Sequence, residues 1–563
     1  MNFAVIEGMP SSSDKILSAD DHLVAAARCA AVAITVLPFL LLLSIDYDRV
    51  AVLALIPAIL LGRNRAGRTS PADRAAMIDR ALLVTGCGFA LISCLTGPHR
   101  AASLTTLSSL VWIVATALLA RRCAAAPRAL RLLLLGLCGG AALGCLGVWW
   151  AWHGRSSSGV FPFYGHWRIF GLHMMVGAMC GLGLLLETKR SRAEQMLTGL
   201  ATAVTAGGLL WSGGRAPLAG AFAGLTLWFW RLPSVKRGRF VLVTLSLLGV
   251  GLGLSVLQWS PESYLGWWTA VDRTVAATSV NELTSTRADF WRASWIHFQQ
   301  HPWLGYGADA YRYLTPKMDG DQPHNWLLQL LLDFGVVGGI AAAALLVRQG
   351  LRGIANARDG SDTSALRLAA TAAFAACLAT GLLDGVFYHA VVLIPAAILG
   401  GIAGAPRRRG SSLVPSHSSA PGHSFTACKS ALVAAAVVCL GLHSYLVYHL
   451  RFAVVPLPNS TPAQVLRQFP STTTGIDRWL EAWKKRDDSL ALAWALWAQK
   501  HAAGPAPLYL FAAVIYADHD DFAAADQQMA AALQSAHWTS RPALEHMRAS
   551  IQAAAPSSTK ESR

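Results

Sequence analysis

The stretch Pro323-His324-Asn325-Trp326-Leu327-Leu328-Gln329 leads directly into an apolar run that continues to about residue 347. A run of this length is long enough to cross a bilayer as a helix. It begins with a histidine and an amide, and polar groups at a membrane edge usually serve function rather than packing. The stretch therefore predicts a membrane helix with a candidate site at its entry.

The rest of the chain repeats this apolar pattern. Its 563 residues are 54% hydrophobic and 14% charged, with a mean hydropathy of +0.42, which is too apolar for a soluble globule. Further runs fall near 25–45, 50–62, 76–97, 103–120, 130–152, 169–187, 195–211, 216–230, 240–259, 365–384, 388–405 and 429–448. The sequence thus predicts an all-α, polytopic membrane protein with about 12–13 transmembrane helices.

The basic residues give the orientation of these helices. Lys and Arg cluster in alternate connections, at 63–74, 121–128, 189–192, 231–239, 348–358 and 407–409. The positive-inside rule puts these connections in the cytoplasm and the entry of the 324–347 run on the outer face. This asymmetry explains the formal charge of +16, so we predict no nucleic-acid partner. We expect residues 1–24 to be a cytoplasmic segment without a cleaved signal peptide.

Composition divides the remainder of the chain. We expect a transmembrane core at 25–405 with a large outer loop at 260–323, a Ser- and Pro-rich linker at 406–428, an additional helix at 429–448 and an outer helical domain at 449–563. Residues 508–516 and 522–533 resemble one tetratricopeptide-type hairpin that could dock a protein partner. Aromatic residues at helical spacing in 287–300 fit either a helix on the membrane surface or one packed over the bundle.

The sequence indicates neither a metal site nor a set of disulfide bonds. All ten cysteines fall in predicted spans or on the cytoplasmic side, so no outer disulfide framework is expected. Asp319-Gly320-Asp321 superficially resembles the metal-binding carboxylate pairs of nucleotide-sugar glycosyltransferases. It lies in the outer loop, where nucleotide sugars are not supplied. We predict no metal site and no cofactor.

Three residues stand out at the outer face. Arg215 lies in the turn Trp211-Ser212-Gly213-Gly214-Arg215-Ala216-Pro217, where an arginine binds an anion or extends to the lipid headgroups. Arg287 opens the 287–300 helix, as an anion ligand or a solvated side chain. His324 could accept a proton at neutral pH, or could cap its helix.

The predicted topology puts further candidate residues on the same face. Asn325 could orient the imidazole or bind substrate, and His389 lies at the outer end of the next hairpin with Asp384 beside it. Arg168 and His173 form another cluster. Arginines and histidines around one outer cavity fit a diphosphate substrate: guanidinium groups would hold the phosphates, and a histidine would deprotonate an incoming hydroxyl.

The motifs that carry these residues resemble those of the O-antigen ligase and Wzy-type polymerase superfamily. The resemblance rests on four segments: Ser212–Arg215, Arg287–Trp295, His301-Pro302-Trp303-Leu304-Gly305-Tyr306-Gly307, and His324–Gln329 with the following Asp333-Phe334-Gly335-Val336-Val337-Gly338. It covers about 165–405. In this family the loop at 260–323 and the domain at 449–563 would be periplasmic, on a multi-pass protein of the bacterial inner membrane.

The resemblance implies a metal-independent glycosyltransferase that moves a glycan from undecaprenyl diphosphate to an acceptor hydroxyl. Arg215 and Arg287 would bind the diphosphate, and His324 would be the general base. The acceptor could be lipid A-core, a growing polysaccharide or a protein, because the chain extends beyond the plain ligase pattern. The alternatives within the superfamily are therefore a polysaccharide polymerase and a protein O-oligosaccharyltransferase. A polysaccharide transporter or an assembly scaffold is the alternative from another class, although no inverted repeat is visible.

Overall fold

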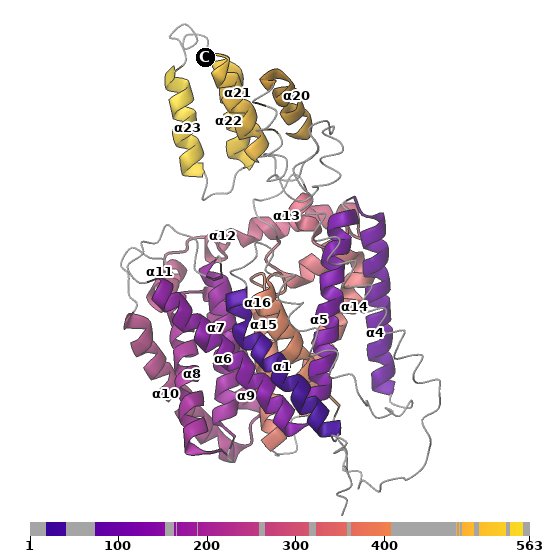
Figure 1. The fold of residues 1–563 in the computed structure, drawn as a ribbon, viewed down its shortest axis with the longest axis vertical. Helices are drawn as coiled ribbons and strands as arrows, with labels where there is room; N and C mark the ends of the chain where they lie inside the picture. Colours follow the sequence, from indigo (N-terminus) through magenta and orange to yellow (C-terminus); the bar gives the residue numbers. More distant parts are fainter. Residues whose placement is uncertain are drawn as a thin grey trace, which may run out of the picture.

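A computed structural model describes residues 19–40, 74–98, 100–152, 163–164, 166–187, 190–257, 265–314, 322–356, 362–406, 480, 484, 487–499, 506–535 and 541–554. This part of the chain contains helices and no strands, which confirms the predicted all-α class. Figure 1 shows the long helices side by side in one bundle, with short helices across one of its ends.

Seven helices in the described ranges are long and apolar enough to cross a membrane. They are α4 (Arg74–Thr96), α5 (Arg100–Cys123), α6 (Pro127–Trp152), α7 (Trp167–Leu185), α10 (Ser234–Leu257), α14 (Trp326–Asn356) and α15 (Asp362–Gly381). The chain is therefore a multi-pass membrane protein, as the sequence predicts.

Four more predicted runs form helices in the same bundle. They are α1 (Ala19–Leu40), α8 (Arg192–Trp211), α9 (Arg215–Arg231) and α16 (Ala390–Ala403), which pack against α6, α7, α15 and α5, respectively. The runs at 50–62 and 429–448, and the linker between the core and the second of these, lie outside the described residues.

Small residues allow α9 and α15 to approach closely. A Cβ atom at Gly224 would lie 2.7 Å from the carbonyl oxygen of Ala372, and one at Gly220 would overlap the hydroxyl of Thr380. Close backbone approach of this kind is a common source of helix association inside a membrane, where burial of apolar surface gives no advantage over lipid. The contact fixes the start of α9, which carries Arg215, relative to the end of α15, which leads to Asp384.

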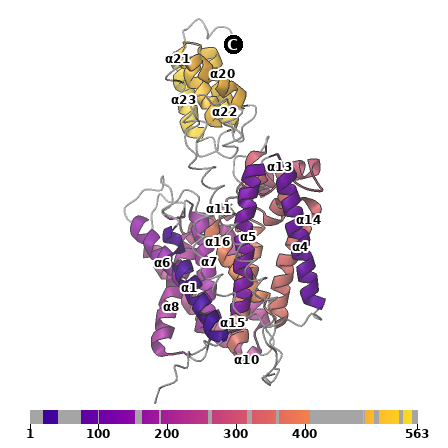
Figure 2. The same cartoon turned by 45° about the vertical axis from the view of Figure 1, so that its right-hand side comes forward.

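The outer loop folds over one end of the bundle as α11 (Trp267–Val275), α12 (Val280–Leu283), α13 (Arg287–Gln300) and the short 3-10 helix η2 (Ala310–Tyr313). Both views of the molecule show α11 and α13 at this end (Figure 2). Phe290 and Phe298 of α13 are buried against Tyr306, Tyr311 and Leu332. This burial favours the helix packed over the bundle rather than the one lying on the membrane surface.

The segment His301–Gly307 binds a kink in α14. Gly335 has φ +68° and interrupts the helix, which leaves preceding carbonyl groups without their usual partners. The loop supplies donors: Tyr306 N–H bonds to the Leu332 oxygen (3.0 Å) and Gly307 N–H to the Asp333 oxygen (2.9 Å). In return, Val336 N–H bonds to the Pro302 oxygen (2.7 Å). The histidine-containing motif therefore has a structural role that joins the outer loop to α14.

The C-terminal helices α20 (Asp488–Gln499), α21 (Ala506–Asp518), α22 (Phe522–Ser535) and α23 (Arg541–Ala554) pack in chain order, each against the next. The pairing of α21 with α22 agrees with the hairpin expected from the sequence. Buried Asp526 of α22 accepts hydrogen bonds from Arg548 and Gln552 of α23 and joins the last two helices. These helices form the small C-terminal helical unit.

Replacing Gly335 by alanine is expected to destabilise the protein by at least about 2 kcal/mol, because a left-handed backbone is strained for other residues and the new Cβ would overlap the Trp303 carbonyl. The control is Gly253→Ala in α10, where a Cβ meets nothing within 4 Å. Its melting temperature in detergent should stay within about 2 °C of wild type. Equal melting temperatures for the two variants would contradict the kink.

Candidate active site

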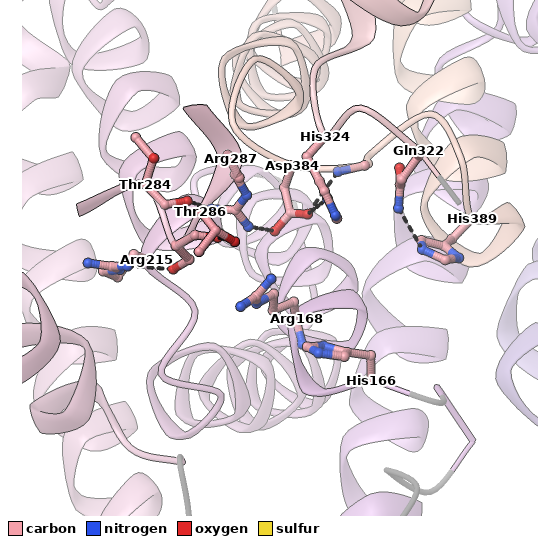
Figure 3. Close-up of polar contacts among 12 residues, drawn as sticks. His166, Arg168, Arg215, Thr284, Thr286, Arg287, Gln322, His324, Asp384 and His389 are labelled. Atoms are coloured by element: carbon pink, nitrogen blue, oxygen red, sulfur yellow. Dashed lines mark hydrogen bonds and ion pairs between the residues drawn. The ribbon is translucent and has the colours of Figure 1, made fainter. Parts of the chain in front are cut away.

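Asp384 lies at the centre of the polar residues at the end of the bundle that α11, α12 and α13 cover (Figure 1). It follows α15 in a turn, where Gly385 N–H donates to its Oδ1 (2.9 Å), and its side chain is only 7% exposed. Arg287 Nη2 donates to Oδ2 (2.7 Å), and His324 Nδ1 donates to Oδ1 (3.1 Å). Figure 3 shows Asp384 between these two side chains. One carboxylate thus joins the starts of α13 and α14.

The surrounding charges keep Asp384 ionised. Burial alone would raise the pKa of this carboxyl group. The Arg287 guanidinium, the hydrogen bond from His324 and the charge of Arg168 outweigh burial and lower the pKa of Asp384 well below its usual range. At neutral pH the group is therefore a carboxylate that can only accept hydrogen bonds.

The Asp384 carboxylate determines which nitrogen of the His324 imidazole carries the hydrogen. Since Asp384 accepts the hydrogen on Nδ1, Nε2 carries the lone pair and can take up a proton. The Phe290 ring packs edge-on against the imidazole, with the ring centres 5.3 Å apart. His324 also has φ +54°, a strained backbone conformation that often occurs at functional sites. The contact with Asp384 thus fixes the ring so that Nε2 is the nitrogen free to accept a proton.

Asn325 organises the same helix start. Its Oδ1 accepts hydrogen bonds from Leu327 N–H (3.0 Å) and Leu328 N–H (3.1 Å), and its Nδ2 donates to the Leu382 oxygen (3.1 Å). These bonds cap α14 and attach it to the turn that carries Asp384. These contacts hold the backbone beside His324, and the orienting of the imidazole by Asn325 stays a prediction.

Arg215 is held by the outer loop. Its guanidinium donates to the Ser285 hydroxyl (2.6 Å), the Arg273 oxygen (3.2 Å) and the Glu282 oxygen (3.3 Å). Ser285 and the adjacent Thr286 both have a left-handed backbone, directly before Arg287. Contacts with the protein therefore fix this arginine beside the segment that leads to Arg287, which differs from the alternative of a side chain extended to the headgroups.

Arg168 and His166 enter from the start of α7. His166 caps this helix, with its Nδ1 accepting from Arg168 N–H (3.0 Å). Burial, together with the neighbouring Arg168 charge, lowers the pKa of His166 to about 3, so its ring is neutral at neutral pH. Figure 3 shows Arg168 extending toward the group formed by Arg287 and Asp384. The site therefore contains a third guanidinium beside those of Arg215 and Arg287.

The other two predicted histidines differ in their surroundings. His389 Nε2 contacts Gln322 Nε2 at 3.4 Å on the far side of His324, at the edge of the site (Figure 3). His173 is fully buried inside the bundle, where its Nδ1 bonds to the Tyr164 hydroxyl (2.9 Å). The structure therefore brings Arg168, Asp384 and His389 toward His324, whereas His173 packs apart from them.

Some contacting residues carried no distinctive sequence signal. His166 lies two residues before Arg168, but its capping role depends on where α7 begins. Arg273 and Gln322 lie in the outer loop, among many polar residues, and their partners come from distant segments. The sequence also associated Asp384 with its neighbour His389, whereas the fold turns the carboxylate toward His324.

Within the described ranges, no group of three or more His, Cys, Asp or Glu side chains is arranged to hold a metal ion. Asp319 and Asp321, the carboxylates considered for metal binding, lie outside these ranges. The chemistry that the site offers is cationic and basic. Its guanidinium groups can bind an anion such as a diphosphate, and its oriented imidazole can accept a proton.

Fold and site together define a multi-pass membrane protein with a contacting Arg287–Asp384–His324 group and further arginines at one end of its helix bundle. Residues 200–343 match a family model described as O-antigen ligase. The matched segment contains Arg215, Arg287 and His324, and it confirms the resemblance inferred from the sequence over this part of the chain. The match indicates glycan transfer of the O-antigen ligase or polymerase type, from a lipid-linked glycan. No curated protein matches the chain.

Arg287→Gln is expected to destabilise the protein by about 3 kcal/mol, because it leaves the buried Asp384 carboxylate without its guanidinium partner. The double variant Arg287→Gln, Asp384→Asn should recover part of this loss, since no unpaired charge remains. Thermal unfolding in detergent at neutral pH measures both. The ion pair would be unimportant for stability if Arg287→Gln unfolded at the wild-type temperature.

Proposed function

We propose that this protein transfers a glycan from undecaprenyl diphosphate to an acceptor hydroxyl on the periplasmic face of the bacterial inner membrane, as an O-antigen ligase-type glycosyltransferase. The observation that carries the proposal is the contact of Asp384 with both Arg287 and His324. It puts an oriented general base beside a guanidinium group, and two of these residues lie in the segment that matches the O-antigen ligase model.

The arginines would bind the diphosphate of the donor. Guanidinium groups form paired hydrogen bonds with phosphate oxygens and keep their charge at any physiological pH. Arg215, Arg287 and Arg168 approach from α9, α13 and α7, so they can surround an anion from different sides. Fixed positive charges of this kind would stabilise the leaving group without a metal ion or a cofactor.

The reaction would proceed by displacement at the anomeric carbon. His324 Nε2 takes the proton of the acceptor hydroxyl as its oxygen bonds to that carbon. The bond between the carbon and the phosphate oxygen breaks, and its electron pair leaves with undecaprenyl diphosphate. The departing diphosphate gains one negative charge, which the arginines balance, and configuration at the anomeric carbon is inverted. Asp384 keeps His324 in the tautomer required and stabilises the imidazolium that forms.

The acceptor hydroxyl could belong to lipid A-core, to a growing polysaccharide or to a protein. The same base and the same anion-binding arginines serve all three, because they act on the donor and on the hydroxyl proton. The C-terminal helices α20–α23 are a candidate surface for an acceptor protein or another partner. The acceptor is therefore a matter for direct assay.

The test incubates purified protein with undecaprenyl diphosphate-linked glycan and each acceptor class in the presence of a chelator. Wild type should transfer glycan to one of them, and His324→Ala and Arg215→Ala should lower kcat/KM by at least about 100-fold. Arg292→Gln is the matched control. This arginine is exposed on α13 in the same loop and should leave transfer unchanged.

Unchanged transfer by a folded His324→Ala protein would exclude His324 as the base. Loss of wild-type transfer on adding the chelator would contradict metal independence. Failure of wild type to transfer to any acceptor, when a characterised ligase does so under the same conditions, would instead favour a transporter or an assembly scaffold.

A further inference from the structure

A tryptophan at the start of α7 contacts two arginines from different segments. The guanidinium carbons of Arg168 and Arg273 each lie over the Trp167 ring, 5.1 Å from its centre. Arg168 is the next residue along α7, whereas Arg273 comes from α11 in the outer loop. A tryptophan face is the strongest aromatic partner for a cation, so the indole ring can fix both guanidinium groups.

Arg273 is bound to the turn that carries Arg215. Its Nη2 donates to the Gly213 oxygen (2.7 Å), and its own backbone oxygen accepts from Arg215 Nη1 (3.2 Å). A further bond from Gly266 N–H to the Trp211 oxygen (2.5 Å) joins the start of α11 to the same turn. Trp167 therefore connects Arg168 to Arg215 through Arg273.

Arg168 differs from the other arginines of the site in its hydrogen bonding. Arg287 donates to Asp384, and Arg215 donates to three oxygens of the outer loop. The guanidinium of Arg168 makes no hydrogen bond or ion pair with any residue in the described ranges, although it is half-buried. Its donors are consequently available to a ligand, while its position depends on Trp167.

We propose that Trp167 and Arg273 are positioning residues that hold the Arg168 guanidinium for binding of the donor diphosphate. Arg168 supplies the N–H donors for the diphosphate, and Trp167 fixes their position. Arg273 contacts both Trp167 and the turn of Arg215, so it fixes the position of Arg168 relative to Arg215. Because the two positioning residues act through Arg168 and Arg215, they affect binding of the anion and not the proton transfer at His324. The inference rests on the proposed diphosphate-linked donor.

The test compares Trp167→Leu, Trp167→Tyr and Arg273→Gln with wild type in the full-length protein. Affinity for inorganic pyrophosphate and for undecaprenyl diphosphate is measured directly in detergent, and donor KM and kcat are measured in the transfer assay. The controls are Trp150→Leu, which changes a tryptophan that is 86% exposed near the outer end of α6, and Arg292→Gln in α13. Melting temperatures identify variants that do not fold.

Trp167→Leu is expected to weaken pyrophosphate binding and to raise donor KM about tenfold. The value of kcat should fall by a smaller factor, because Arg168 also balances the charge of the departing diphosphate. Trp167→Tyr should restore most of this loss, because a smaller aromatic ring still binds the cation. Arg273→Gln should act in the same direction, and combining it with Trp167→Leu should add little. Both controls should match wild type.

Wild-type affinity in a folded Trp167→Leu protein would overturn the inference, as would a fall in kcat with KM unchanged. Should the leucine variant fail to fold, Trp167→Tyr decides: an affinity about threefold weaker than wild type supports the inference, and an unchanged affinity overturns it. Absence of pyrophosphate and undecaprenyl diphosphate binding by wild type would also overturn it. Normal binding with these mutational effects, but no glycan transfer, would contradict the proposed function alone.

Discussion

The arrangement of the site depends on the hydrogen bonds that the buried carboxylate of Asp384 accepts from Arg287 and His324. Arg287 lies at the start of α13, His324 at the start of α14, and Asp384 in the turn after α15. A buried carboxylate is stable only when it is paired. Here its partners are Arg287, the proposed diphosphate ligand, and His324, the proposed general base. Folding of three segments and preparation of a base thus rely on one side chain.

The remaining structure serves to bring those three segments together. Small residues let α9 approach α15, which fixes the Arg215 turn relative to the Asp384 turn. The His301–Gly307 segment joins the outer loop to the kink at Gly335, and so sets α13 over α14. Ser285, Thr286 and His324, all beside the site, have a left-handed backbone that is strained for residues other than glycine. Rigid helices and a tightly bonded loop are what a preorganised anion site requires.

Much of the fold follows from local sequence, because apolar runs of membrane length specify their own helices and basic loops specify orientation. Arg215, Arg287 and His324 were recognisable for the same reason, as polar residues at the ends of such runs. The residues that contact these side chains could not be predicted in the same way. Asp384 was associated with His389 five residues away, and only tertiary packing turns it toward His324. Trp167 and Arg273 are joined across about a hundred residues, a pairing that no local pattern encodes, and His173 proved to be packed within the bundle.

The most direct test of the central claim is a double-mutant cycle on the rate of glycan transfer. It compares kcat/KM for wild type, His324→Ala, Asp384→Asn and the double variant. If Asp384 acts by orienting His324, its replacement should matter little once the imidazole is absent. The kcat/KM of the double variant should then lie within about threefold of that of His324→Ala. If the two single losses multiply in the double variant, the residues act independently, and the account of one carboxylate preparing one base is contradicted.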